Sequence, residues 1–523
     1  MTRITIDPIT RIEGHLRIDC EVDGGKVTKA WSSGQMWRGI EIILKDRDPR
    51  DAWIFTQRIC GVCTTVHAIT SVRAVENALN MEVPLNAQYI RNMIVAAHGI
   101  HDHIVHFYQL AALDWVDIVS ALKGDPEGAS KLGATLSDYK ANSVPNIRAV
   151  RDKLKTFVDT GNLGVFASGY WGHPAMKLPP DVNLLAATHY IQALEVQRIA
   201  NKIVTILGSK TPHIQNLAVG GVANPINPDS QSTLTLERLF AIRALIDELG
   251  DFVNNAMMND VAAVGALYAE WTKYGAGITN YLSVPDLPLD TKGTKFELPG
   301  GYIPGDLAKF QPITSYQDAF FRDGVKEAVK HSWYEYSGSK SALHPFDGQT
   351  APKYDDFHDD GKYSWIKAPT FLDKRAQVGP LANVLGMYAA GHEPTKRHLT
   401  KLVEVASKVA GSQIPLTALH STTKSPMKQV RWPKIGWRRP ARTEFQPLSS
   451  WIRREPLPGL ATPWPWRKRF WTRSSMAPST STERRRTTRG RKRMNGSWHR
   501  HRRKSRKPST PKIGIWPQPN WPR

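Results

Sequence analysis

Cysteine is scarce in this chain: its 523 residues contain three, Cys20, Cys60 and Cys63. Three cysteines cannot form the framework of several disulfides that stabilises small secreted proteins, and Cys20 has no evident partner. The sequence also has no uninterrupted apolar run long enough to cross a bilayer, and it does not open with the basic and apolar segment of a signal peptide. These absences favour a large folded protein in which Cys60 and Cys63 serve a metal or redox site.

Acidic residues are nearly absent from the last hundred positions. Residues 425–523 contain 27 of the 70 Lys and Arg residues but 3 of the 47 Asp and Glu residues, so all of the net charge of +23 arises there. The same segment holds 9 of the 17 tryptophans and 14 of the 36 prolines, and it shows no sustained periodicity. We predict two parts: a folded domain over residues 1–424, with a net charge of about −1, and a disordered basic tail over residues 425–523. Tryptophan and arginine enriched together are typical of a GC-rich message translated in the wrong frame, and we interpret the tail as frameshift-derived.

The hydrophobic pattern predicts strands near the N-terminus and helices after it. Apolar and polar residues alternate in short stretches of residues 3–45, and Asp23-Gly24-Gly25 is typical of a turn. Helical spacing dominates from Pro49 onward. The helical stretches are residues 86–122, 183–207, 233–271 and 378–410, whereas residues 285–305 and 337–362 are rich in Gly, Pro and Asp and predict loops. We therefore expect an α+β fold that is predominantly helical, with a small N-terminal β region.

Cys60 and Cys63 form a Cys-x-x-Cys pair in the stretch RICGVCTTVH, residues 58–67. Two thiolates at this spacing can bind one metal ion, and Gly61 favours a tight turn between them. His67 could reach back to a sulfur as a hydrogen-bond partner. Taken alone, the pair fits half of a zinc site or a redox motif about equally well.

The stretch around the cysteines is one of several that resemble the large, catalytic subunit of nickel–iron hydrogenases, in particular uptake enzymes of the hydrogenase-2 type. The RxCGxCxxxH signature is highly specific, and the resemblance extends from residue 3 to about residue 422. The matching stretches are Arg11–His15, Arg38–Glu41, Arg47–Ala52, Arg58–His67, His101–Tyr108, Gly169–Pro174, Thr211–Asn216, Val219–Gly221 and Tyr363–Lys367.

This resemblance implies the large-subunit fold and a nickel–iron centre whose iron carries carbon monoxide and cyanide. It implies that Cys60 is a terminal nickel ligand and that Cys63 bridges nickel and iron, and soft thiolates suit nickel. It assigns Glu13 to proton transfer beside a cysteine ligand, because a carboxylic acid within hydrogen-bond reach can pass on the proton that H2 cleavage releases. The alternative for Glu13 is a surface ion pair with Arg11.

The resemblance also implies a magnesium ion with Glu41 as a ligand, and a hard carboxylate oxygen suits magnesium. An ion pair of Glu41 with Arg38 or Lys45 is the alternative. His213 and Lys367 resemble buried polar residues near that magnesium, although ordinary hydrogen bonding in the core explains them nearly as well.

Asp102 has His98 and His106 four residues before and after it, so the three share a face of a predicted helix. On spacing alone they look like a metal cluster. The resemblance instead places Asp102 among the polar residues over the nickel–iron centre and gives the histidines a structural or proton-transfer role.

The sequence departs from the family after about residue 422. The family has a second pair, in an Asp-Pro-Cys-x-x-Cys-x-x-His motif, whose cysteines complete the nickel site and whose histidine binds magnesium; no cysteine follows Cys63 here. The family's arginine over the metal centre also falls in this region. We therefore expect this chain to bind nickel weakly and to be inactive.

The resemblance implies H2 oxidation, an iron–sulfur small subunit that holds the iron–sulfur clusters and accepts the electrons, and maturation proteins. It also implies a periplasmic, membrane-associated location. The alternative is a protein that binds nucleic acid nonspecifically through the arginines and tryptophans of the tail. No motif of specific nucleic-acid recognition accompanies the tail.

Overall fold

The N-terminal residues form the predicted small sheet. The computed structural model describes residues 2–167, 169–224, 234–274, 277–336, 342–343 and 350–411. Strands β1 (Thr2–Ile6), β2 (Leu16–Asp23) and β3 (Lys26–Gly34) pair antiparallel in the order β1-β2-β3. Gly24 and Gly25 join β2 to β3 with φ of 54° and 74°. Two consecutive positive φ values are the geometry of the tight turns that glycine permits, which explains the turn that the sequence predicts.

Helices make up most of the rest of the described chain, as predicted. Prolines begin the two longest: Pro84 precedes α4, and Pro180 occupies the first turn of α8. The α-helices are α1 (Ile40–Leu44), α2 (Ala52–Thr56), α3 (Thr64–Ala78), α4 (Leu85–Val105), α5 (Ile118–Ala121), α6 (Pro126–Leu136), α7 (Val144–Asp159), α8 (Pro180–Gly208), α9 (Leu236–Phe252), α10 (Met258–Leu267), α11 (Ala319–Gly324), α12 (Pro380–Ala389) and α13 (Glu393–Gly411).

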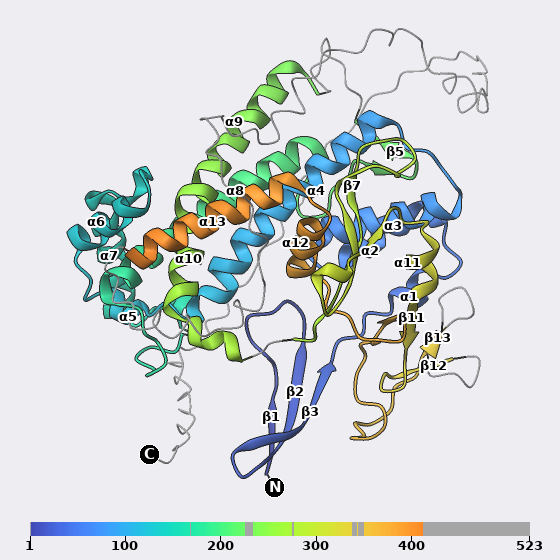
Figure 1. Cartoon of the computed structure of the whole chain (residues 1–523), viewed down its shortest axis with the longest axis horizontal. Helices are drawn as coiled ribbons and strands as arrows, with labels where there is room; N and C mark the ends of the chain where they lie inside the picture. The colour runs from blue at the N-terminus through green and yellow to red at the C-terminus, as the bar shows by residue number, and fades with distance from the viewer. Residues whose placement is uncertain are drawn as a thin grey trace, which may run out of the picture. The chain divides into compact units, whose positions relative to one another are not determined.

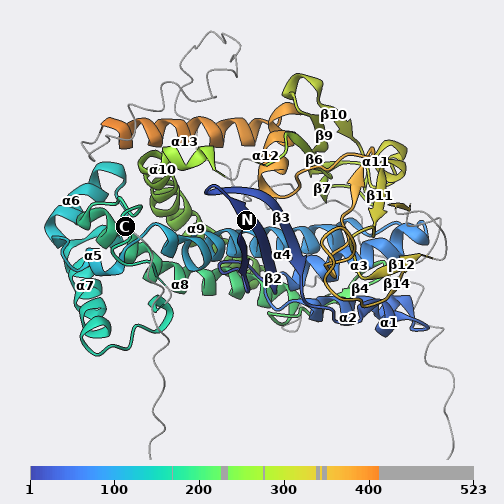
Figure 2. The same cartoon turned by 90° about the horizontal axis from the view of Figure 1, so that it is seen from below.

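The hydrophobic core lies where α4 and α8 pack along each other. Ile90, Ile94 and Ala97 recur at helical spacing on α4 and are buried, and Ile203 and Val204 of α8 belong to the same core cluster. The axes of helices α4, α8 and α13 are roughly aligned (Figure 1, Figure 2). Helix α13 packs against α10. This layer holds the helix α4, which carries Asp102, in a fixed position.

Three predicted helical stretches are interrupted, and the first, residues 86–122, ends as α4 at Val105 and resumes as α5 at Ile118. Residues 233–271 form α9 and α10 with a π-helical turn, Val253–Met257, between them. Residues 378–410 form α12 and α13, and α12 ends before Gly391, whose φ is 79°. A glycine in the left-handed region is a common helix end, because it satisfies the last carbonyls without a Cβ clash.

The loop predicted over residues 285–305 is wrong, because three short strands lie within it. Strands of three to five residues interrupted by Gly and Pro are too short to show alternation, and hydrogen bonds to neighbouring strands create them. The later strands are β4 (Leu217–Ala218), β5 (Gly221–Val222), β6 (Asn280–Ser283), β7 (Asp286–Pro288), β8 (Phe296–Leu298), β9 (Gly300–Pro304), β10 (Gln311–Ile313), β11 (Val325–Ala328), β12 (Tyr334–Tyr336), β13 (Ala342–Leu343), β14 (Thr350–Pro352) and β15 (Thr370–Phe371).

The sheets are small, which confirms the predominantly helical α+β fold. Among the described residues no sheet exceeds three strands, and the strands pair antiparallel. The predicted loop over residues 337–362 contains β13 and β14, and part of it lies outside the described residues. The small sheets of residues 280–371 lie at the end of the helical layer opposite α5–α7 (Figure 1, Figure 2). The tail predicted to be disordered, residues 425–523, lies outside the described residues.

Candidate metal centre

Cys60 and Cys63 lie at the beginning of α3, where a short 3-10 helix (Gln57–Ile59) ends. Cys60 is buried, with 8% of its surface exposed, and Cys63 is half-buried. The backbone amides of Val62 and Cys63 each donate to Cys60 Sγ at 3.2 Å. Amides at the N-terminus of a helix favour a thiolate over a thiol, so this position suits a metal-binding sulfur. Gly61 is not required for the turn, since its φ is not positive and a Cβ there would meet open space.

Glu13 reaches the same sulfur from the loop between β1 and β2. Its Oε1 lies 3.8 Å from Cys60 Sγ, and the side chain is otherwise exposed. Arg11, offered above as a partner for Glu13, forms an ion pair with Asp114, with 3.0 Å between Nε and Oδ1. A carboxylate in contact with both solvent and Cys60 Sγ is placed to exchange protons with it.

The two thiol groups act on each other. Burial raises the pKa of the Cys63 thiol to about 12, with further contributions from a hydrogen bond and charge interaction with Cys60 and from the negative charge of Asp102. Without a metal, Cys63 is therefore a neutral thiol at neutral pH. A bound cation reverses this, because a coordinated thiol is deprotonated by the metal.

Two buried threonines that follow Cys63 connect the cysteines to the rest of the site. Thr64 Oγ1 lies 2.8 Å from His213 Nδ1, and Thr65 Oγ1 lies 3.0 Å from His98 Nδ1. Burial lowers the pKa of His213, with the positive charges of Arg58 and Lys210 adding to the effect. The threonines were not singled out from the sequence, although their place directly after the Cys-x-x-Cys pair is a signal. Their contacts place His213 on the cysteine side of the site.

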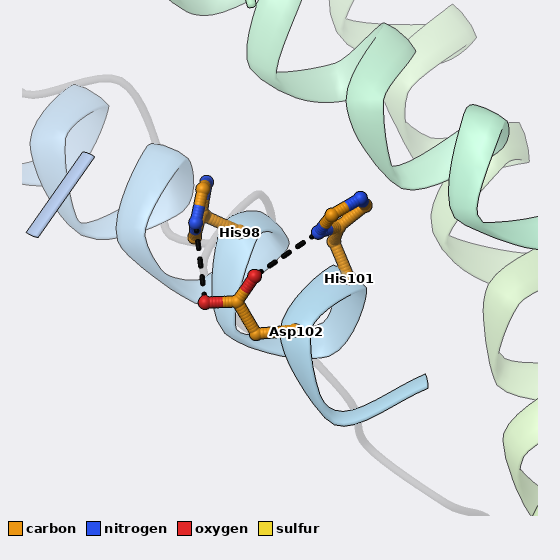
Figure 3. A group of neighbouring side chains, drawn as sticks. All are labelled: His98, His101 and Asp102. Atoms are coloured by element: carbon orange, nitrogen blue, oxygen red, sulfur yellow. Dashed lines mark hydrogen bonds and ion pairs between the residues drawn. The ribbon is translucent and has the colours of Figure 1, made fainter. Parts of the chain in front are cut away.

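Asp102 lies between two histidines on α4, but not the pair that the sequence indicated. His98 Nε2 is 3.2 Å from Asp102 Oδ2, and His101 Nδ1 is 3.1 Å from Asp102 Oδ1 (Figure 3). The expected neighbour His106 is exposed, although its amide still donates to the Asp102 carbonyl in the last turn of α4, which ends at Val105. The π-helix His106–Ala111 begins at this residue, so the i, i+4 spacing from Asp102 is kept while the His106 side chain is exposed.

Electrostatics keep the Asp102 carboxylate ionised. Burial raises the pKa of Asp102, but the interactions with His101 and His98 outweigh it and hold the pKa at about 2. The carboxylate is therefore a permanent negative charge near the cysteines at neutral pH.

Glu41 lies in a separate polar group. It is exposed in the first turn of α1, and Tyr334 donates to its Oε1 at 3.0 Å. Lys367 Nζ lies 4.8 Å from the centre of the Tyr334 ring and 3.2 Å from Glu327 Oε2. The described residues show no ion pair of Glu41 with Arg38 or Lys45. Lys367 thus shares a neighbour with Glu41.

His67 is linked to the cysteines through the backbone. Its amide donates to the Cys63 carbonyl at 3.4 Å, and burial lowers the pKa of its half-buried ring. In the part of the chain that the structure describes, its ring makes no hydrogen bond to either sulfur, so its role stays a prediction. In the same part, one group of three His, Cys, Asp or Glu ligand atoms is close enough to share an ion, and it consists of His98, His101 and Asp102.

Comparison with known proteins identifies the family. The nickel-dependent hydrogenase profile matches residues 38–427, and a second profile, described as HoxL-like, matches residues 3–32. The chain belongs to the nickel-dependent hydrogenase family. It is 58% identical over 421 residues to the hydrogenase-2 large chain of Escherichia coli (strain K12), a match that covers 80% of this chain and 74% of that protein. It is 44% identical over 443 residues to the uptake hydrogenase large subunit of Rhizobium leguminosarum bv. viciae, covering 80% and 72% respectively.

Solved structures support the same assignment. The Ni-Fe-Se hydrogenase of D. vulgaris Hildenborough in its reduced state is 30% identical, with a TM-score of 0.57 over 80% of this chain and 79% of that chain. The [NiFeSe]-hydrogenase of Dm. baculatum is 29% identical, with a TM-score of 0.55 over 80% and 79%. This hydrogenase chain is thus a large subunit of an oxidoreductase that acts on H2.

The residues present fit one half of a nickel–iron centre. Cys60 and Cys63 offer two soft sulfur donors at a helix N-terminus, and Glu13 lies beside one of them. Cys20 cannot supply a third thiolate at this place, because it lies in β2, paired between Ile4 of β1 and Ala30 of β3. When bound, such a centre supplies heterolytic cleavage of H2.

Proposed function

We propose that this chain is the large subunit of an uptake hydrogenase that oxidises H2 and passes the electrons to an iron–sulfur small subunit. The observation that carries the proposal is the approach of Glu13 Oε1 to Cys60 Sγ, at 3.8 Å, at the N-terminus of α3. The names of the E. coli and Rhizobium relatives support the uptake role and a large-subunit partnership. The small subunit, rather than this chain, holds the iron–sulfur clusters.

In this proposal Cys60 and Cys63 would hold the nickel–iron centre, which would supply the heterolytic cleavage of H2. Glu13 receives a proton from Cys60 Sγ and releases it to solvent, since its other face is exposed. Asp102, ionised beside His98 and His101, keeps a negative charge over the site. His67, in the first turn of α3, is proposed to hydrogen-bond a cysteine sulfur through its ring.

Several finer features of the proposal depend on the family. The iron carries carbon monoxide and cyanide ligands, and maturation proteins install the centre. A magnesium ion binds at Glu41. The Glu41 carboxylate, which accepts a hydrogen bond from Tyr334, supports this assignment because magnesium prefers oxygen ligands. The enzyme works at the periplasmic face of the membrane, held there by its partner subunits. Within the described part of the chain, no helix is long and apolar enough to span a bilayer.

We further propose that this polypeptide is inactive as it stands. Its sequence holds three cysteines, of which two lie at the site, whereas the family uses four thiolates. The family match ends at residue 427, close to residue 424, where we divide a hydrogenase domain from a basic, frameshift-derived tail. No observation on the described residues favours the alternative of nucleic-acid binding through that tail.

The test uses two chains, each co-expressed with the small subunit and maturation proteins. The first is this chain, and the second is a chimera in which residues after 422 are replaced by the corresponding C-terminal part of the E. coli hydrogenase-2 large chain. We expect no H2-dependent dye reduction and less than stoichiometric nickel in the first chain. The chimera should reduce the dye with H2 and bind stoichiometric nickel. The Cys60→Ser variant of the chimera should lose both properties, whereas Cys20→Ser, on β2, should keep them.

Two results would contradict the proposals separately. Turnover with stoichiometric nickel in the unaltered chain would refute its inactivity and leave the hydrogenase function standing. A folded chimera that binds its small subunit but retains activity after Cys60→Ser would refute the assignment of the site.

A further inference from the structure

Helix α4 carries a second cluster of metal-ligand side chains beside the cysteines. His98, His101 and Asp102 each direct one ligand atom into a common space, and these atoms all lie within 4.8 Å of one another (Figure 3). The two histidine rings are 5.7 Å apart between centroids and tilted by 44°, so both face the carboxylate without stacking. Ligands around a four-coordinate zinc ion are about 3.3 Å apart, given bonds of about 2.0–2.1 Å. The separations of 3.2 Å and 3.1 Å from the carboxylate oxygens to the two rings are close to that value.

His98 is oriented for coordination by its other nitrogen. Its Nδ1 lies 3.0 Å from Thr65 Oγ1, and a hydrogen bond donated to that oxygen leaves Nε2 with a free lone pair. The residue is 5% exposed, and its buried Nε2 makes no hydrogen bond within the described residues, although Asp102 lies close to it. Nε2 is directed at the Asp102 carboxylate, 3.2 Å from Oδ2, so a cation that binds there displaces the proton between the ring and the carboxylate while Thr65 holds the ring in place.

We propose that His98, His101 and Asp102 form a binding site for one divalent transition-metal ion, Zn²⁺ in the first instance, which lies beside the Cys60/Cys63 site and uses neither of its thiolates. Two imidazoles and one carboxylate suit Zn²⁺ better than Mg²⁺ or Ca²⁺, which prefer oxygen ligands. Asp102 is partly exposed, with 38% of its side chain accessible, so water can complete the coordination.

Occupation of this site has a consequence for the cysteines. Thr65, which holds His98, lies two residues after Cys63, and the charge of Asp102 acts on the Cys63 thiol. A cation on Asp102 neutralises that charge and removes the carboxylate from the cysteine site. Occupation of the cluster therefore removes a negative charge from beside Cys63 without displacing a thiolate ligand.

The test measures Zn²⁺ and Co²⁺ binding to the full chain in a Cys60→Ser/Cys63→Ser background, which removes the thiolates. Equilibrium dialysis with elemental analysis gives the stoichiometry, and the visible spectrum of bound Co²⁺ reports its coordination. We expect one bound ion whose spectrum lacks a thiolate charge-transfer band. His101→Gln and Asp102→Asn should each weaken its binding by roughly tenfold or more.

The matched control is His103→Gln, which removes an exposed histidine from the same helix next to the cluster. It should leave the affinity and the cobalt spectrum unchanged. His98→Gln is a second loss-of-ligand variant, used if circular dichroism shows that this buried substitution keeps the fold. Equal binding by the His103, His101 and Asp102 variants, or no bound ion in the double-serine background, would overturn the proposal.

Discussion

Replacing Glu76 by Ala should weaken the attachment of the C-terminal end of α3 to α4. Glu76, on α3, and Arg91, on α4, form a buried pair with 6% and 0% of their side chains exposed. The guanidinium donates to both carboxylate oxygens, at 2.7 Å and 3.0 Å. It also donates to the carbonyls of Ala218 and Gly221 at 2.8 Å, and the Gly220 amide donates to Glu76 Oε1 at 2.7 Å. The pair thus joins α3, α4 and the β4–β5 hairpin.

The free-energy cost of Glu76→Ala follows from the burial of the pair. Removing one partner leaves an uncompensated buried charge, which costs about 3–5 kcal/mol. Because each 1.4 kcal/mol is a factor of ten, amides of the β4–β5 hairpin should exchange about two to three and a half orders of magnitude faster in Glu76→Ala. Hydrogen-exchange mass spectrometry of peptides that cover this hairpin and α3 measures the change without assuming two-state unfolding.

Two further variants make the result specific. Asp159→Ala breaks an exposed i, i+4 pair with Lys155 on α7 and should change exchange in this region by nothing measurable. The double replacement Glu76→Leu/Arg91→Met removes both buried charges and should be less destabilising than Glu76→Ala alone. If the hairpin amides exchange as slowly in Glu76→Ala as in Asp159→Ala, the inference that this pair holds α3 to α4 is refuted.

Three other predictions concern the same region. Because the pKa of Asp102 is lowered to about 2 from its ordinary 3.8, its contribution to stability is present above pH 3.8 and is lost as the pH falls through about 2. The difference in stability between the protein and Asp102→Asn should therefore shrink across that range in acid titrations followed by circular dichroism. A difference that stays constant from pH 5 to 2 would contradict this. Because the pKa of Cys63 is raised to about 12, the metal-free protein should alkylate at Cys63 at least roughly a hundredfold more slowly than a free peptide thiol at pH 8, measured by mass spectrometry with iodoacetamide, and equal rates would disprove it. Tyr108→Phe removes a buried hydrogen bond of 2.6 Å to Asp260 and should lower stability by about 1.5–3 kcal/mol in thermal unfolding, whereas no loss would show that this hydroxyl is not needed there.

Local chemistry was enough to predict much of this protein from the sequence. Cys60 and Cys63 are close because only two residues separate them, and the flanking signature indicates their metals. The strands before residue 34 follow from alternation, and the glycines at 24 and 25 place the turn, because only local backbone preferences decide it. The long helices follow from apolar residues at helical spacing, a pattern that depends on no distant partner.

The pairing of short strands, and the contacts that have no spacing rule, had to come from the tertiary structure. The strands β7, β8 and β9 exist because each is hydrogen-bonded to another strand, and nothing in their own three to five residues requires it. Neither the contact of Glu13 with Cys60 nor that of Thr65 with His98 has a spacing rule, since loops and helix packing bring them together.

The residues around Asp102 show most clearly what the sequence determines and what the tertiary structure decides. The sequence predicted His98 and His106 as its neighbours, because an ideal helix places i−4 and i+4 on one face. The structure keeps His98, adds His101 and leaves His106 exposed at the end of α4, although the i, i+4 spacing from Asp102 to His106 is kept. Residue spacing therefore determined which side chains could meet, whereas the tertiary structure decided which of them do.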